Sequence, residues 1–98
     1  DDLLMILHKI SSSPFSYKAL HHCLQRMHEK DGLLLTQDSV YTVMHQTLYT
    51  KLTELHSVFV LKEDAEARGV QVKNDHIQLI SYAEFVELSL KYEKVMSW

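Results

Sequence analysis

The sequence has few of the features that would reveal a chemical activity. Its one cysteine, Cys23, excludes an internal disulfide and favours a reducing compartment. Ten basic and thirteen acidic residues give a formal charge of −3, which argues against a domain that holds a nucleic-acid backbone by itself. No apolar run approaches the roughly 20 residues needed to span a bilayer. A glycine-rich phosphate loop and a Gly-x-Ser-x-Gly motif are also missing.

Metal-ligand spacing is missing too, although seven histidines are many for 98 residues. No two histidines are four apart, and a Cys-x-x-Cys pair is impossible. Cys23 lies on the apolar stripe of a predicted helix, which is typical of a small buried hydrophobe. His22 adjoins it, but adjacent helical residues diverge by about 100° and do not face each other. We therefore expect no metal, no cofactor and no enzymatic activity.

What is present fits one globular domain. The 98 residues are 46% apolar and 23% charged, so a single modest core is possible and disorder is not expected. The chain begins at Asp1 without Met. We expect a single domain, residues 1–98, that is a fragment of a larger intracellular, nuclear protein.

Local patterns predict four helices. Apolar residues recur at helical spacing, and capping residues or Asp-Gly steps mark the ends. Ser81 and Glu84 have capping-box spacing. The predicted helices run from Leu3 to Ile10, from a cap at Ser16 to Asp31–Gly32, over Ser39–His56, and from Ser81 to about Met96.

Between the last two helices the sequence predicts a small antiparallel sheet. Val58–Leu61 is β-branched and aromatic, as strands are. Val70–Leu79 is predicted to form a hairpin with a turn at Asn74-Asp75, because that turn places Val72 opposite Ile77 and keeps the apolar pairs on one face. A second register pairs Val58–Leu61 with residues 70–73, and both registers can coexist in a three-stranded meander.

Three helices, a hairpin and a closing helix are the order of a winged-helix domain. The stretch Phe15-Ser16-Tyr17 supplies a short first strand, and the helix from Asp38 supplies the second of the helix-turn-helix pair. From Leu3 to Leu90 the layout resembles the winged-helix domains that follow the ATPase module of origin-recognition initiators, with a wing that carries Arg68-Gly69. The resemblance implies an α+β fold and a place in a nucleic-acid-associated assembly.

A rival interpretation is an all-α, degenerate EF-hand pair. With Lys73 as position one of a calcium loop, Ser81 falls at position nine and Glu84 at position twelve, and the stretch 79–86 resembles the exit of such a loop. Gln78 stands where the sharp turn requires glycine, so calcium binding is not expected. This interpretation implies a scaffold module, and the two folds stay open.

The expected binding surface is the third helix together with the wing. An exposed patch of Tyr, His and Gln suits a protein partner better than a phosphate backbone. We therefore expect a non-catalytic interaction domain with a protein partner and no membrane contact. Nucleic acid is the alternative, through Lys51, Arg68 and Lys73. The candidate partner-binding residues are Gln37, Tyr41, His45, Tyr49, Lys51, Arg68 and Lys73.

Overall fold

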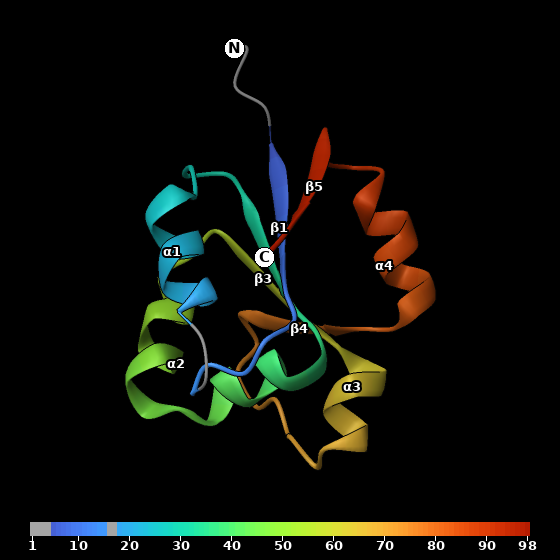
Figure 1. Ribbon diagram of the computed structural model, residues 1–98. Helices are drawn as coiled ribbons and strands as arrows, with labels where there is room; N and C mark the ends of the chain where they lie inside the picture. Colours follow the sequence, from blue (N-terminus) through green and yellow to red (C-terminus); the bar gives the residue numbers. More distant parts are fainter. Residues whose placement is uncertain (1–4, 16–17) are drawn as a thin grey trace.

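The computed structural model describes residues 5–15 and 18–98, and its centre is a five-stranded, all-parallel sheet in the order β4-β3-β2-β1-β5 (Figure 1). All four pairs of neighbouring strands are parallel. The strands are β1 (Ile6–Ile10), β2 (Gly32–Leu35), β3 (Ser57–Leu61), β4 (Ile77–Ile80) and β5 (Lys94–Ser97).

The central strands are continuous apolar runs because both of their faces are covered. Leu33, Leu34 and Leu35 of β2 have no exposed surface, and neither do Val58 and Val60 of β3. Strands that are buried on both sides lack the alternation of polar and apolar residues that marks a sheet with one solvated face. This burial is what fixes β2 and β3 in the middle of the sheet.

Helices cover the two faces of the sheet unequally. One face packs against the larger core cluster, to which Leu20 and Cys23 of α1 and Leu52 of α2 contribute. Among the described residues, α4 is the one helix that contributes to the smaller cluster on the other face. In Figure 1, α1 and α2 lie on one side of the sheet and α4 on the other. The helices are α1 (Ala19–Arg26), the 3-10 helix η1 (Gln37–Met44), α2 (Gln46–Thr53), α3 (Lys62–Ala67) and α4 (Tyr82–Ser89).

The segment that contains α4 connects the two edges of the sheet. Because β4 and β5 lie at opposite edges, the chain must pass over β3, β2 and β1 between them. Phe85, Leu88 and Tyr92 pack on the second face along this path. No residue of α4 is fully buried, so the outer side of this helix faces solvent.

Both predicted folds are wrong. A winged helix needs an antiparallel hairpin, and every strand pair here is parallel. An all-α EF-hand pair is excluded by the five-stranded sheet. The predicted hairpin fails because β4 pairs with β3, whereas residues 70–76 form no strand. Val70 packs instead in the core beside α3, where its N–H donates to the Ala65 carbonyl at 2.9 Å.

Several element boundaries are also corrected. The predicted first helix is β1 over its described part, while Leu3, Leu4, Ser16 and Tyr17 lie outside the described residues. The predicted long third helix is two helices with a break at His45. Residues 62–67, which belong to none of the predicted helices or strands, form α3, which ends before Gly69 at φ 66°. The last helix ends at Ser89, before β5 begins.

Other predictions are confirmed. The strand expected at Val58–Leu61 is β3, and a helix carries the stripe that contains Leu20 and Cys23. The Ser81 side chain accepts from the Glu84 N–H at 3.1 Å, and the Ser81 N–H donates to the Glu84 carboxylate at 2.7 Å. These features depend on neighbouring residues in the sequence, and they form in the same way in a different topology.

Gly32, at the start of β2, leaves room for the ring of Tyr92 against the sheet. A Cβ added there would collide with the Tyr92 hydroxyl. It would lie 2.9 Å from Cζ of Tyr92 and 3.1 Å from Cδ1 of Leu7. Tyr92 belongs to the smaller core cluster, and burial raises the pKa of its hydroxyl. The glycine therefore permits close packing between the segment after α4 and the central strand.

We predict that Gly32→Ala lowers the free energy of unfolding by about 2 kcal/mol, as overpacking does in a filled core. In a Tyr92→Phe background the same substitution should cost less, because the hydroxyl is gone. Urea unfolding followed by circular dichroism would measure both effects. Equal costs in the two backgrounds would contradict this account.

Candidate functional site

A buried carboxylate joins three parts of the chain at the amino ends of the strands. Asp31 is 1% exposed, and its Oδ1 accepts from the Ile6 N–H at 3.0 Å. Its Oδ2 accepts from the His28 N–H at 3.0 Å and from His8 Nε2 at 2.9 Å. Burial alone would raise the pKa of Asp31, but these hydrogen bonds together lower it below its ordinary value of 3.8.

The same network reaches the last strand through His8. Trp98 Nε1 lies 3.0 Å from His8 Nδ1, and an indole N–H can only donate. Nδ1 is therefore the acceptor, so Nε2 carries the proton that goes to Asp31. His8 is 2% exposed. The hydrogen bonds from Asp31 to His8 and from His8 to Trp98 link the end of β5 to β1 in the interior of the fold.

We predict that Asp31→Asn lowers the free energy of unfolding by about 3 kcal/mol at pH 7, because a buried, charge-assisted network loses its acceptor. The folded pKa is lower than the unfolded one. The stabilisation is therefore complete above the unfolded value of 3.8 and is lost as the pH falls through the folded value.

Urea unfolding between pH 3 and pH 7 would measure this loss. The Asn variant should lack that part of the pH dependence, and Asp75→Asn on the exposed turn should keep it. A wild-type pH dependence in Asp31→Asn would contradict the role of this carboxylate.

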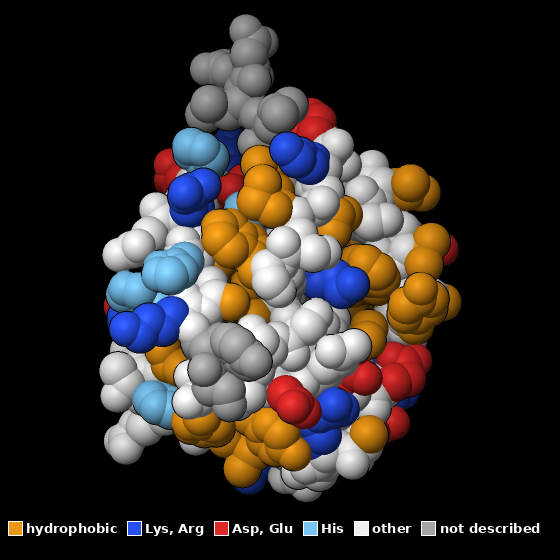
Figure 2. All heavy atoms as spheres, viewed as in Figure 1, with side chains coloured by type: hydrophobic (Ala, Val, Ile, Leu, Met, Phe, Trp, Pro, Cys, Tyr) orange, Lys and Arg blue, Asp and Glu red, His pale blue; other side chains and the backbone are white. Residues whose placement is uncertain are grey.

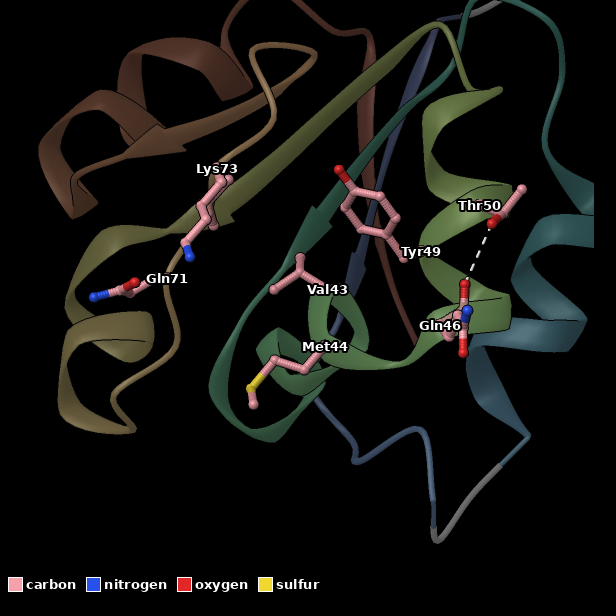
Figure 3. Close-up of a pocket in the computed structure, with 8 residues that line it drawn as sticks. Val43, Met44, Gln46, Tyr49, Thr50, Gln71 and Lys73 are labelled. Atoms are coloured by element: carbon pink, nitrogen blue, oxygen red, sulfur yellow. Dashed lines mark hydrogen bonds between the residues drawn. The ribbon is translucent and has the colours of Figure 1, made fainter.

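A pocket of about 410 Å³ lies between η1, α2 and the segment before β4 (Figure 3). Val43 and Val72 form part of its apolar lining, and Lys73 and Gln71 lie on the opposite side from α2. The Tyr49 hydroxyl accepts from Asn74 Nδ2 at 2.8 Å, which holds α2 to this segment. The lining residues are Val43, Met44, Gln46, Tyr49, Thr50, Gln71, Val72 and Lys73.

A second hollow of about 430 Å³ lies at the carboxyl ends of β2 and β3. Gln37 follows β2 with φ at +48°, an unfavourable backbone conformation for a residue with a side chain. Its N–H donates to Asp64 Oδ2 at 2.6 Å, and the Thr36–Ser39 capping box holds the preceding residue. Strain of this kind persists only where the surroundings enforce it.

The structure brings together only part of the predicted binding surface. Tyr49 and Lys73 line the first pocket, whereas Gln37 lines the second. Arg68 is the cation that holds η1, because its Nε donates to Asp38 Oδ1 at 2.9 Å. Lys51 is exposed on α2 and lines neither pocket.

Tyr41 and His45 also have structural contacts. Tyr41 packs against the larger core cluster. His45 Nδ1 accepts from the Leu48 N–H at 3.2 Å and so caps α2, and its ring lies 5.6 Å from that of Phe15. Whether any of the seven candidate residues contacts a partner stays a prediction.

Sequence reasoning missed Val43, Met44 and Val72 as pocket residues and the buried network around Asp31. The first two look like ordinary helix positions, and Met44 is exposed because η1 ends there, with 66% of its surface free. Asp31 reads as a helix stop beside glycine, and no local signal shows that β1 and Trp98 fold over it.

The one cysteine is poorly placed for chemistry. Cys23 has no exposed surface and lies in the larger core cluster. Burial, and secondarily the negative charge of Asp31, raises the pKa of its thiol from 9.0 to about 12. Since the thiolate is the nucleophile, this side chain behaves as a core residue in the folded chain.

Within residues 5–15 and 18–98 no three His, Cys, Asp or Glu side chains gather as a metal site would require. Among the same residues no helix has the length and apolar character to cross a membrane.

Comparisons with known proteins decide the family. The sequence model described as DsrH like protein matches residues 12–95. Protein TusB of Pectobacterium parmentieri is 34% identical over 97 residues, which cover 95% of this chain and all of the relative. The chain belongs to the DsrH/TusB family.

A second TusB sequence agrees with this assignment, and one solved structure has the same fold. TusB of Cronobacter sakazakii is 33% identical over 96 residues, 95% of this chain and 100% of that protein. The crystal structure of the ychN protein from E. coli has the same fold, with a TM-score of 0.76 at 17% identity over 98% of this chain and 100% of that one.

The family overturns the predicted function and location. A DsrH/TusB chain is neither a winged-helix domain of a DNA-associated assembly nor an EF-hand scaffold. The nuclear location is wrong because these relatives are bacterial, and bacteria have no nucleus. The predicted protein partner is consistent with membership of this family. Nothing in these comparisons supports direct duplex DNA binding.

Proposed function

We propose that this chain is a component of the sulfur relay that serves thiouridine modification of tRNA, and that it acts there as a non-catalytic subunit of an assembly with other Tus proteins. Membership of the DsrH/TusB family supports the process. The environment of Cys23 carries the assignment of a non-catalytic role.

A sulfur relay moves a sulfane sulfur between cysteines. The acceptor thiolate attacks the terminal sulfur of a donor persulfide, the donor S–S bond breaks, and the donor leaves as a thiolate. The acceptor must therefore be accessible and deprotonated. Cys23 is neither, because it is fully buried and a thiol pKa of about 12 leaves about a thousandfold less thiolate near neutral pH than its ordinary value.

We predict that Cys23→Ala supports thiouridine formation at no less than half of the wild-type level. Bacteria that lack their own TusB would be given either chain, and thiouridine in their tRNA would be measured by mass spectrometry. Cells without any TusB chain should lose most of this modification. If Cys23→Ala abolished thiouridine while the variant still folded and assembled, the non-catalytic assignment would be wrong.

A matched chemical control uses the thiol itself. Native chain should react with a disulfide reagent at least 100-fold more slowly than chain unfolded in urea at the same pH, because folding removes both access and thiolate. Equal rates would show an accessible Cys23 and would contradict the premise of the proposal.

The first pocket is the proposed contact for another Tus protein. It combines apolar lining from Val43 and Val72 with the amphipathic Tyr49 and the charged end of Lys73. Interfaces favour aromatic and methionine side chains that are ringed by polar groups. Met44 lines this pocket and is 66% exposed, so it is apolar surface that a partner would cover.

We predict that Met44→Glu weakens binding of the other Tus proteins at least tenfold, measured by isothermal titration calorimetry, because a carboxylate would have to be desolvated in the contact. Thr47→Glu adds the same charge to an exposed position of α2 outside the pocket lining and should change the affinity less than twofold. Equal effects of the two substitutions would remove the pocket from the interface.

A further inference from the structure

Trp98 is the side chain that attaches β5 to the interior of the fold. β5 lies at one edge of the sheet and pairs with β1 alone (Figure 1). Three of its four residues are exposed. Within residues 94–98, Trp98 is the one side chain that packs against a core cluster. The attachment of this edge strand therefore depends on the pairing with β1 and on the Trp98 ring.

A hydrogen bond holds the Trp98 ring, and it uses the nitrogen at which His8 would bind a second proton. The indole N–H donates to His8 Nδ1 at 3.0 Å, while His8 Nε2 donates its proton to Asp31 at 2.9 Å. A second proton on the imidazole would have to bind at Nδ1. Two N–H groups would then face each other, and neither can accept a hydrogen bond.

Asp31 decides which of the two partners moves. Its pKa lies below 3.8, so the carboxylate stays charged between pH 5 and pH 8. A positive charge on His8 would therefore be paired with Asp31 inside the fold, which offsets much of the cost of burying that charge. His8 can keep its place when it binds a proton, whereas the Trp98 indole loses its acceptor.

Other titratable groups around this network come from neighbouring segments. Burial and, secondarily, the charge of Asp31 raise the pKa of the Cys23 thiol on α1 to about 12. Burial raises the pKa of the Tyr92 hydroxyl, after α4, above 10.0. Neither group changes its charge between pH 5 and pH 8. His28 contributes its backbone N–H to Asp31, and its own side chain is exposed. The charged residues on β1, on β5 and directly before β5 are Lys9, Lys94 and Glu93.

We propose that proton uptake by His8 releases the Trp98 ring and thereby frees β5 from the edge of the sheet. A falling pH favours the released form, because only that form leaves Nδ1 free for the additional proton. The departure of β5 uncovers the edge of β1, whose backbone N–H and C=O groups then lack partners. This inference goes beyond the proposed relay function and does not require it.

Trp98 is the one tryptophan of the chain, so its fluorescence reports this site. A local reporter is needed because the chain has seven histidines, and Figure 2 shows histidine side chains on the surface around α1. We expect acrylamide to quench Trp98 about threefold more efficiently at pH 5 than at pH 8, because local opening exposes the ring. The far-UV circular dichroism should change little. Quenching efficiency is measured rather than brightness, because a charged imidazole can itself quench a neighbouring indole.

Two matched substitutions test whether His8 is the responsible group. His8→Gln keeps an N–H for Asp31 and a carbonyl for the indole but binds no proton, so the quenching of Trp98 should not depend on pH. His28→Gln removes an imidazole from the residue that bonds Asp31 through its backbone, and it should keep the wild-type response. An unchanged pH response in His8→Gln, or its loss in His28→Gln, would overturn the inference.

Measurements on the wild-type chain decide the question if His8→Gln does not fold. Amide hydrogen exchange of residues 94–97, corrected for its intrinsic pH dependence, should rise about tenfold more than that of β3 between pH 8 and pH 5. Unchanged quenching of Trp98 would mean that the charged His8 ring retains the indole by a cation–π contact across the 6.0 Å between the ring centroids. That outcome, or simultaneous unfolding of β3, would overturn the inference.

Discussion

The fold depends on one buried carboxylate. Asp31 accepts hydrogen bonds from the backbone at the start of β1, from the loop before β2 and from the ring of His8. Through His8 it also positions Trp98 at the end of β5. Parallel strands cannot be joined by short turns, so their alignment must come from contacts that are remote in sequence. Asp31 supplies such contacts at the amino ends of the sheet, where it sets β1 between β2 and β5.

With β1 fixed in that place, the unequal faces of the sheet follow. The connections after β1 and β2 put α1, η1 and α2 on one face, and a single crossing from β4 to β5 leaves α4 on the other. The face that α1, η1 and α2 cover has a pocket near His45, where η1 ends and α2 begins. On the other face, α4 has no fully buried residue. The contact surface proposed at the first pocket is therefore a consequence of the strand order.

The sequence predicted the features that depend on residues adjacent in the chain. It failed for the features that depend on residues distant in the chain. The Ser81–Glu84 cap and the strand β3 depend on a few adjacent residues, and both are confirmed. The stretch from Val70 to Leu79 satisfies the alternation of a hairpin, but Val70 is drawn into the core beside α3 and β4 finds a parallel partner in β3. For the candidate site, Tyr49 and Lys73 line the first pocket, and their contact with a partner stays a prediction. The burial of Asp31 is not visible in the local sequence, because it depends on hydrogen bonds to residues 23 and 25 positions away in the chain.

The position of Cys23 links the fold to the proposed role. Its helix packs on the sheet with Leu20 and Cys23 inward, and Asp31 is close enough for its charge to add to the effect of burial on the thiol pKa. The carboxylate that aligns the strands thus also disfavours the thiolate. To expose a reactive thiol, α1 would have to leave the core, which would remove contacts that the whole larger cluster shares. Under the proposed function, a chain built this way contributes surfaces to a relay, and the transferable sulfur belongs on cysteines of its partners.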